Sequence, residues 1–311
     1  MKQQDHGFVL VNALILIAAL ASVATLLLAR ADAGRERLSQ SRTAYQLELN
    51  LDAFEALAIH TLVRTADGGP DHLQRDWAKA RYDVPLEHGR VAGHIKDLQG
   101  LFNINWLTDQ DNTDAQTAFD RLVLRLGVSA QDNAAIHALL RPGGPEDTAA
   151  HLGLDPPETP VGGALFMIQQ LDRMPGISAR GRDRLRPYLT ALPGDSKLNI
   201  NTADPLVLAA FLPSLSAAEV DQLLASRRQS PFTSVQDLLV LIGMASEAED
   251  DPDAAPESIS TLASRLDIRS EWFKAQITAN VGSRKADRQS VLHRTGIPAK
   301  AVIAWRLTSR Y

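Results

Sequence analysis

Residues 8–29 read FVLVNALILIAALASVATLLLA, an apolar stretch without a single charged residue. At 1.5 Å per residue, a helix of this length spans roughly 30 Å, the thickness of the hydrocarbon core of a bilayer. The clearly polar interruptions are Asn12, Ser22 and Thr25. The stretch therefore predicts a membrane anchor, or a helix that leaves the membrane to pack among other apolar helices.

Two other interpretations of this stretch stay open from the residues alone. A cleaved secretory signal has a basic head and an apolar run of about 7–15 residues, whereas here Lys2 is balanced by Asp5 and the run is longer. A small-x-small cleavage motif nevertheless occurs in LLARADA at 27–33. A plain single-pass anchor is the other interpretation, and the arginines at 30–37 leave its orientation undecided.

The segment after the apolar run predicts a continuation of the same helix. Residues 35–65 contain neither proline nor glycine. Apolar residues recur there at intervals of three and four, which predicts one buried stripe of an amphipathic helix; they are Leu47, Leu51, Phe54, Ala58 and Leu62. We expect one long helix, loosened near Gly34 and ended by ADGGP at 66–70. Its second half would pack on a soluble domain, and its first half would stand out bare.

The step from polar to apolar residues at Gly7 and Phe8 resembles the head of type IV pilins and pseudopilins. That resemblance implies a short leader, here residues 1–7, which a prepilin peptidase removes between Gly7 and Phe8 on the cytoplasmic face. It also implies an inner-membrane protein that crosses the membrane once, with its carboxy-terminal body in the periplasm.

The sequence departs from the pilin pattern at Asn12. In the superfamily this position, counted from Phe8, usually carries a glutamate that pairs with the free amine of a neighbouring subunit. A carboxylate in an apolar setting needs such a partner, whereas asparagine can hydrogen-bond an amine but cannot neutralise it. Asn12 is either a tolerated polar residue near a helix end or the mark of a tip subunit, whose place in the filament lacks that partner.

The order of predicted elements indicates an α+β fold: a pilin-like long amino-terminal helix packed on a small antiparallel sheet, with a large all-α domain inserted. Residues 80–100 predict two strands joined by a turn at His88-Gly89. Residues 269–311 predict three short strands. The predicted parts of the chain are a leader at 1–7, a filament-core helix at 8–29, the rest of the helix and the first strands at 30–107, the inserted helical domain at 108–268, and the last strands at 269–311.

Residues 198–243 of the insertion are similar to the helix-hairpin-helix modules of DNA-binding proteins. Those modules need glycines in the hairpin, because backbone N–H groups there approach phosphate closely. Here Ser214 and Ser216 occupy the glycine positions, and the chain carries a net charge of −5. A helical packing unit, with Thr202 capping its first helix, is therefore favoured. A membrane-anchored, competence-like DNA-binding protein is the alternative function.

The spacing of the eight histidines forms no catalytic constellation, and the chain has no cysteine, so we expect a protein that is not an enzyme. Two acidic loops, at 109–114 and 247–257, offer hard oxygen ligands that can hold Ca²⁺. In the first loop the candidate ligands are Asp109, Asp111 and Asp114. Neither loop has the EF-hand pattern, so calcium is a secondary hypothesis and no cofactor is required.

Three segments together resemble the general secretion pathway protein K family, the large minor pseudopilins of type II secretion systems. They are DLQGLFNINWL at 97–107, LNINTADPLVLAAFLP at 198–213 and SEWFKAQITANVG at 270–282. The resemblance covers essentially the whole chain and implies a subunit at the tip of the periplasmic pseudopilus, where it helps initiate assembly for export across the outer membrane.

The same resemblance implies a set of partners. They are the minor pseudopilins I and J, with pseudopilin H and the major pseudopilin as further candidates, the prepilin peptidase and the inner-membrane assembly platform. No nucleic acid is among them. Members of the resembled family can also bind calcium in the inserted region.

Overall fold

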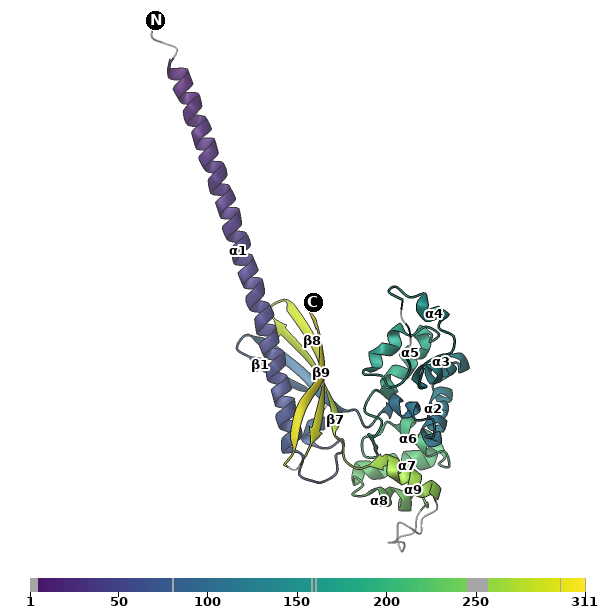
Figure 1. Ribbon diagram of the computed structural model, residues 1–311. Helices are drawn as coiled ribbons and strands as arrows, with labels where there is room; N and C mark the ends of the chain where they lie inside the picture. The colour runs from purple at the N-terminus through teal and green to yellow at the C-terminus, as the bar shows by residue number, and fades with distance from the viewer. Residues whose placement is uncertain are drawn as a thin grey trace.

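The protein consists of a long amino-terminal helix, a five-stranded antiparallel sheet and a helical domain beside the sheet (Figure 1). This computed structural model describes residues 5–79, 81–157, 159, 161–244, 257–296 and 298–310. The architecture confirms the predicted α+β class. The chain enters the helical domain from the end of one strand and returns into the adjacent strand, so the helical domain is an insertion within the sheet domain.

Helix α1 runs from Asp5 to Arg64. It passes through Gly34 without interruption, so the predicted loosening at that residue is wrong. The five residues of the predicted stripe, from Leu47 to Leu62, are all between 0 and 3% exposed. The periodicity therefore identified the face of the helix that packs on the sheet, and this prediction is confirmed.

The sheet has the strand order β1-β2-β7-β8-β9, with every neighbouring pair antiparallel. The strands are β1 Tyr82–Leu86, β2 Gly89–Asp97, β7 Trp272–Val281, β8 Arg284–Thr295 and β9 Lys300–Arg310. The β1–β2 turn is Glu87-His88, one residue before the predicted His88-Gly89. The last three strands are 10, 12 and 11 residues long, so the expectation of short strands was wrong.

One face of the sheet packs against α1, because successive strand residues point to opposite faces and the inward ones are apolar. Phe273, Ala275 and Ile277 on β7 are at most 2% exposed and join the core that the α1 stripe forms. Gly93 on β2 lets this contact form, since a Cβ there would lie 2.7 Å from the ring of Phe54. The opposite face lies toward the helical domain (Figure 1).

The elements of the helical domain are mostly short. They are β3 Phe102–Asn103, η2 Ile104–Thr108, α2 Thr113–Arg125, α3 Ala130–Leu140, α4 Ala149–Leu152, η3 Ile168–Arg173, α5 Ala179–Leu185, η4 Arg186–Tyr188, β4 Leu189–Thr190, β5 Leu198–Asn199, α6 Pro205–Phe211, α7 Ala217–Gln229, α8 Val235–Leu241, α9 Glu257–Arg265 and β6 Leu266–Asp267. Phe102, Ile104 and Trp106 belong to the core of this domain. The predicted boundary at residue 108 therefore falls inside the domain, which begins shortly after β2.

The two halves of the helical domain begin in the same way, with Asn-Ile-Asn at 103–105 and at 199–201. In each half the first short strand pairs in parallel with a second one at the end of that half, β3 with β4 and β5 with β6. The first asparagine of each motif accepts a hydrogen bond from the backbone N–H of the second, at 3.2 and 2.9 Å. The second asparagine then pairs with a distant backbone segment, Asn105 with Leu165 and Asn201 with Phe232.

Local capping explains where the helices after the second motif begin. Asp204, not the predicted Thr202, caps α6 by accepting a 2.9 Å hydrogen bond from the N–H of Leu206. Ser216 and Glu219 form a capping box at the start of α7, which satisfies the free N–H groups of that turn reciprocally. Ser216, one of the two serines in the glycine positions of the hairpin, thus fits a helical packing unit.

Candidate functional site: the bare helix and the domain junction

The first half of α1 stands clear of the rest of the protein (Figure 1). It is the one helix in the described part of the chain that is long and apolar enough to cross a membrane, by length and composition. Its most apolar 18-residue window has a mean hydropathy of 2.5 and is 0% buried. An apolar surface this large on a soluble body marks a contact with lipid or with other protein helices.

The polar interruptions of this helix differ in how they are satisfied. The hydroxyl groups of Ser22 and Thr25 donate to the carbonyl oxygens of Ala18 and Ser22, at 2.8 and 2.9 Å, as an apolar environment requires. The exposed Asn12 makes no side-chain hydrogen bond to any residue described by the structure. Its amide is therefore available to a partner outside this chain.

The predicted processing position lies within the first turns of α1. Phe8 is 70% exposed, and residues 1–4 of the predicted leader lie outside the described residues. Cleavage between Gly7 and Phe8 stays a prediction.

The second half of α1 is fixed to the sheet by a buried cluster of charges. Arg288 on β8 is 1% exposed, and its Nη1 lies 2.6 Å from Asp52 Oδ1 and 3.0 Å from Glu55 Oε2. Its Nη2 pairs with Glu48, one turn earlier on the helix. Arg306 on β9 adds a second guanidinium, 3.1 Å from Glu55 Oε2.

Burial alone would lower the pKa of Arg288, but Asp52, Glu55 and Glu48 outweigh it and raise that pKa above its ordinary value. The guanidinium is therefore held charged, and the cluster locks the rotation and register of α1 against β8 and β9. Sequence reasoning missed this cluster. Its signal was an arginine at an inward position of a strand that alternates Ala286, Arg288, Ser290, Leu292.

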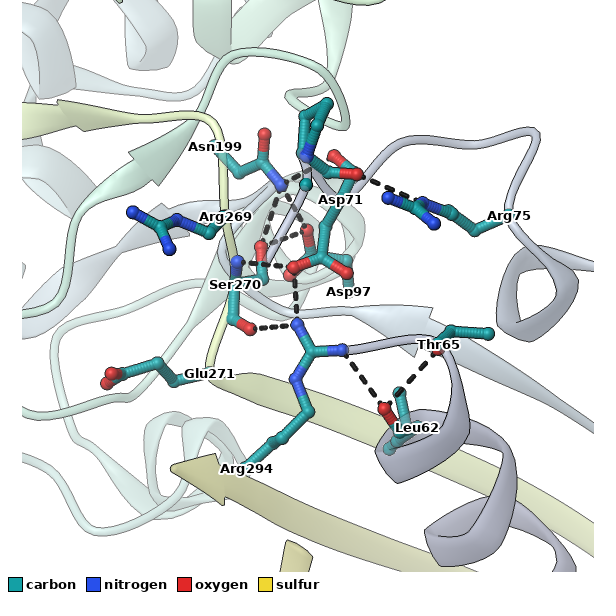
Figure 2. Close-up of polar contacts among 12 residues, drawn as sticks. Leu62, Thr65, Asp71, Arg75, Asp97, Asn199, Arg269, Ser270, Glu271 and Arg294 are labelled. Carbon is teal, nitrogen blue, oxygen red and sulfur yellow. Dashed lines mark hydrogen bonds and ion pairs between the residues drawn. The ribbon is translucent and has the colours of Figure 1, made fainter. Parts of the chain in front are cut away.

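A second polar network joins the sheet to the helical domain (Figure 2). At the end of β2, Asp97 accepts hydrogen bonds from the Ser270 hydroxyl at 2.6 Å, the Asn199 amide at 3.2 Å and the Thr202 hydroxyl. Its other oxygen accepts the backbone N–H of Gln99 at 2.8 Å. Asn199 and Thr202 belong to the helical domain, so one carboxylate binds the two domains together.

Arg294 on β8 completes this junction (Figure 2). Its guanidinium pairs with Asp71 and donates to the carbonyl oxygen of Ser270 at 2.7 Å and to that of Leu62 at 3.2 Å. The backbone carbonyl of Asp71 in turn accepts from Asn199 at 3.1 Å. The last turn of α1, the loop after it and the helical domain are therefore held at one point.

Within the junction, burial disfavours the charged form of the Asp97 carboxylate. Burial raises its pKa from 3.8 to about 6, and the hydrogen bonds from Ser270 and Thr202 only partly oppose that rise. Its four donors are neutral, and the guanidinium of Arg294 pairs with Asp71 instead. The contacts of Asp97 span more than a hundred residues of sequence, which is why no local pattern predicted them.

The structure does not gather the predicted calcium ligands into a group of metal-ligating side chains among the described residues, and calcium binding by them stays a hypothesis. No group of three or more His, Cys, Asp or Glu side chains that could hold a metal ion occurs among the residues the structure describes. Asp109 instead accepts the backbone N–H of Asp111 at 3.1 Å, and Asp114 lies in the first turn of α2. Of the second acidic loop, residues 247–256 lie outside the described residues.

A bare apolar helix whose second half packs on an antiparallel sheet defines a pilin-like filament subunit. Two family models, both described as type II secretion system protein K, match residues 100–194 and 198–260, together about half of the chain. The chain belongs to the type II secretion system protein K family and is a minor pseudopilin of that system.

Two relatives match along nearly their whole length. The type II secretion system protein K of Aeromonas hydrophila is 27% identical over 98% of this chain and 97% of its own. That of Pectobacterium carotovorum subsp. carotovorum is 24% identical over 97% and 96%. The GspK-GspI-GspJ complex of enterotoxigenic Escherichia coli contains a chain with the same fold, at a TM-score of 0.71 and 21% identity, over 88% of this chain and 99% of that one.

Proposed function

We propose that this minor pseudopilin caps the tip of the type II secretion pseudopilus and helps initiate its assembly, as a structural subunit without catalysis. The observation that carries the proposal is Asn12, which is exposed on the bare helix and has no partner within the described chain. Asparagine at this position lacks the carboxylate that would bind the amine of a neighbouring subunit. The chain therefore fits the end of the filament where no such contact is made.

The shape of the helical domain also supports a position at the tip of the filament. It lies beside the sheet and makes the body of the protein much broader than its helix (Figure 1). The charged cluster at Arg288 and the junction at Asp97 hold helix, sheet and helical domain to each other. A broad body fixed on one helix would obstruct the stacking of a further subunit above it.

The proposed partners follow from the structural relative, which was solved as a complex of GspK with GspI and GspJ. We infer that this chain assembles with the corresponding I and J minor pseudopilins in the inner membrane, its body in the periplasm. Its bare helix would then exchange lipid for the helices of its partners, an association driven by van der Waals packing. The minor pseudopilin H, the major pseudopilin and the assembly platform are further proposed contacts.

An epitope tag tests the tip position. The tag is inserted after Gly153 in the exposed loop 153–157 of the helical domain and detected with gold-labelled antibody on sheared pseudopili. We expect gold at one end of each filament, and copurification of the full chain with tagged I and J. Gold distributed along the length would refute the cap, and full assembly in a strain lacking this chain would refute the initiating role.

A further inference from the structure

A cleft of about 260 Å³ lies between the sheet and the helical domain. It opens beside the last residues of β2, which have no strand partner on that side among the described residues, since β1 pairs with β2 only as far as Gly93. The polar side chains that line it include Lys96 from β2 and Arg227 from α7, and Trp77, Leu101 and Pro205 supply apolar wall. We call it the Lys96–Arg227 cleft.

The cations at this cleft are poorly compensated. Arg227 is partly buried, and its hydrogen bond is to a neutral acceptor, the carbonyl oxygen of Ile200, at 2.9 Å. Burial lowers the pKa of Arg227 to about 10, against a smaller opposing effect of the Asp204 carboxylate. A partly buried guanidinium without a carboxylate at bonding distance is an unfavourable arrangement.

Lys96 adds a second unfavourable arrangement. It lies directly opposite Lys274 in the antiparallel pairing of β2 with β7, and like charges in that relation destabilise a sheet. Burial lowers the pKa of Lys274, and the charge of Lys96 lowers it further. Neither lysine, nor Arg227, makes an ion pair within the described part of the chain.

The two carboxylates that line the cleft are already engaged. Asp97 accepts from four neutral donors of the domain junction. Asp204 caps α6 through the N–H of Leu206. The cleft therefore presents cationic donors without enough acceptors, beside an apolar wall.

We propose that the Lys96–Arg227 cleft binds a carboxylate group, with Lys96 and Arg227 as the residues that recognise it. The planar guanidinium matches the fork of a carboxylate, and the wall of Trp77, Leu101 and Pro205 suits a short aliphatic stem. Such a group reaches the cleft as the acidic side chain of a protein segment or as a small free dicarboxylate. Bound there, it offsets the repulsion between Lys96 and Lys274.

Calorimetric titration of the full chain in detergent, at constant ionic strength, tests the recognition. The probes are sodium succinate and N-acetyl-glutamyl-leucinamide, with sodium chloride as the reference. We expect saturable binding of a carboxylate probe, weakened tenfold or more by Lys96→Gln and by Arg227→Gln, because each substitution removes a charged hydrogen-bond donor. Arg284→Gln, which removes an exposed guanidinium on β8, should bind as tightly as the unaltered chain.

A second readout does not depend on the variants. NMR titration of the Lys274 ammonium should show its pKa rising when the probe binds, because an anion then lies near it. Tighter binding of the peptide would assign the cleft to a protein segment, and tighter binding of succinate to a free acid. Absence of saturable binding, an equal loss in Arg284→Gln, or an unmoved Lys274 would overturn the proposal.

Discussion

Arg288 Nη1 lies 3.0 Å from Glu55 Oε2, and both side chains are almost completely buried between α1 and β8. Removing one member of a buried pair leaves the other charge uncompensated. We therefore expect Arg288→Met to lower the free energy of unfolding of the sheet domain by about 3–5 kcal/mol, measured by amide hydrogen exchange on β7 and β8. Arg284→Met, on the exposed end of β8, is the matched control; a loss no larger than that of the control would contradict the locking role.

The Asp97 carboxylate should make the junction sensitive to pH. Because the pKa of Asp97 rises from 3.8 to about 6 on folding, the folded protein holds a proton in this range that the unfolded chain releases. Its contribution to stability is therefore full below about pH 3.8 and is lost as the pH rises through about 6, by on the order of 3 kcal/mol. We expect this loss in pH-dependent unfolding of the unaltered chain and its disappearance in Asp97→Asn; an identical pH profile in both would be incompatible with it.

Asn201 should hold the second half of the helical domain. It accepts from the N–H of Phe232 at 2.8 Å and donates to its carbonyl at 2.9 Å, both buried. Asn201→Ala leaves these backbone groups unpaired, and we expect a loss of roughly 2–4 kcal/mol with faster amide exchange at Phe232. Gln131→Ala, at an exposed position on α3, should leave that exchange unchanged. Unaltered protection of Phe232 in Asn201→Ala would show that the asparagine is dispensable.

Some of these features could be predicted from the sequence, and others could not. The stripe from Leu47 to Leu62 was predictable, because helix periodicity depends on neighbours three and four residues apart. The cap of α6 was misassigned because the Thr202 hydroxyl bonds Asp97, more than a hundred residues away. The contacts of Asn105 with Leu165 and of Asn201 with Phe232 are also non-local, although the repeated Asn-Ile-Asn was a visible signal for them.

Restoring the carboxylate at position 12 tests the tip model. We expect Asn12→Glu to enter the filament away from the tip, because the glutamate can pair with the amine of a neighbouring subunit. The copies of this chain per major pseudopilin, counted by quantitative mass spectrometry of purified pseudopili, should rise at least twofold. Asn12→Gln keeps an amide and should leave the ratio unchanged. A ratio that stays constant with glutamate would argue against the missing carboxylate as the reason for the tip position.

The processing prediction is tested at Gly7. A charged side chain before the scissile bond should block the peptidase, so Gly7→Asp should leave residues 1–7 attached. Intact-mass measurement would then find a chain beginning at Met1, whereas we expect the unaltered protein to begin at Phe8. Mature protein in a strain without the peptidase, or an unaltered chain cut near Ala31, would exclude this route.

The inserted domain leaves the sheet after β2 and comes back at β7, its direct neighbour, and the N–H of Leu98 still bonds the carbonyl of Trp272 at 3.0 Å. Topologically, everything between those two residues is an enlarged hairpin loop. A tight turn could replace it without changing the order of a single strand, so the small filament module is complete in its own right. The helical half can accordingly diverge, grow or be exchanged without altering the order of the strands that carry it, as long as its contacts with Asp97 are kept.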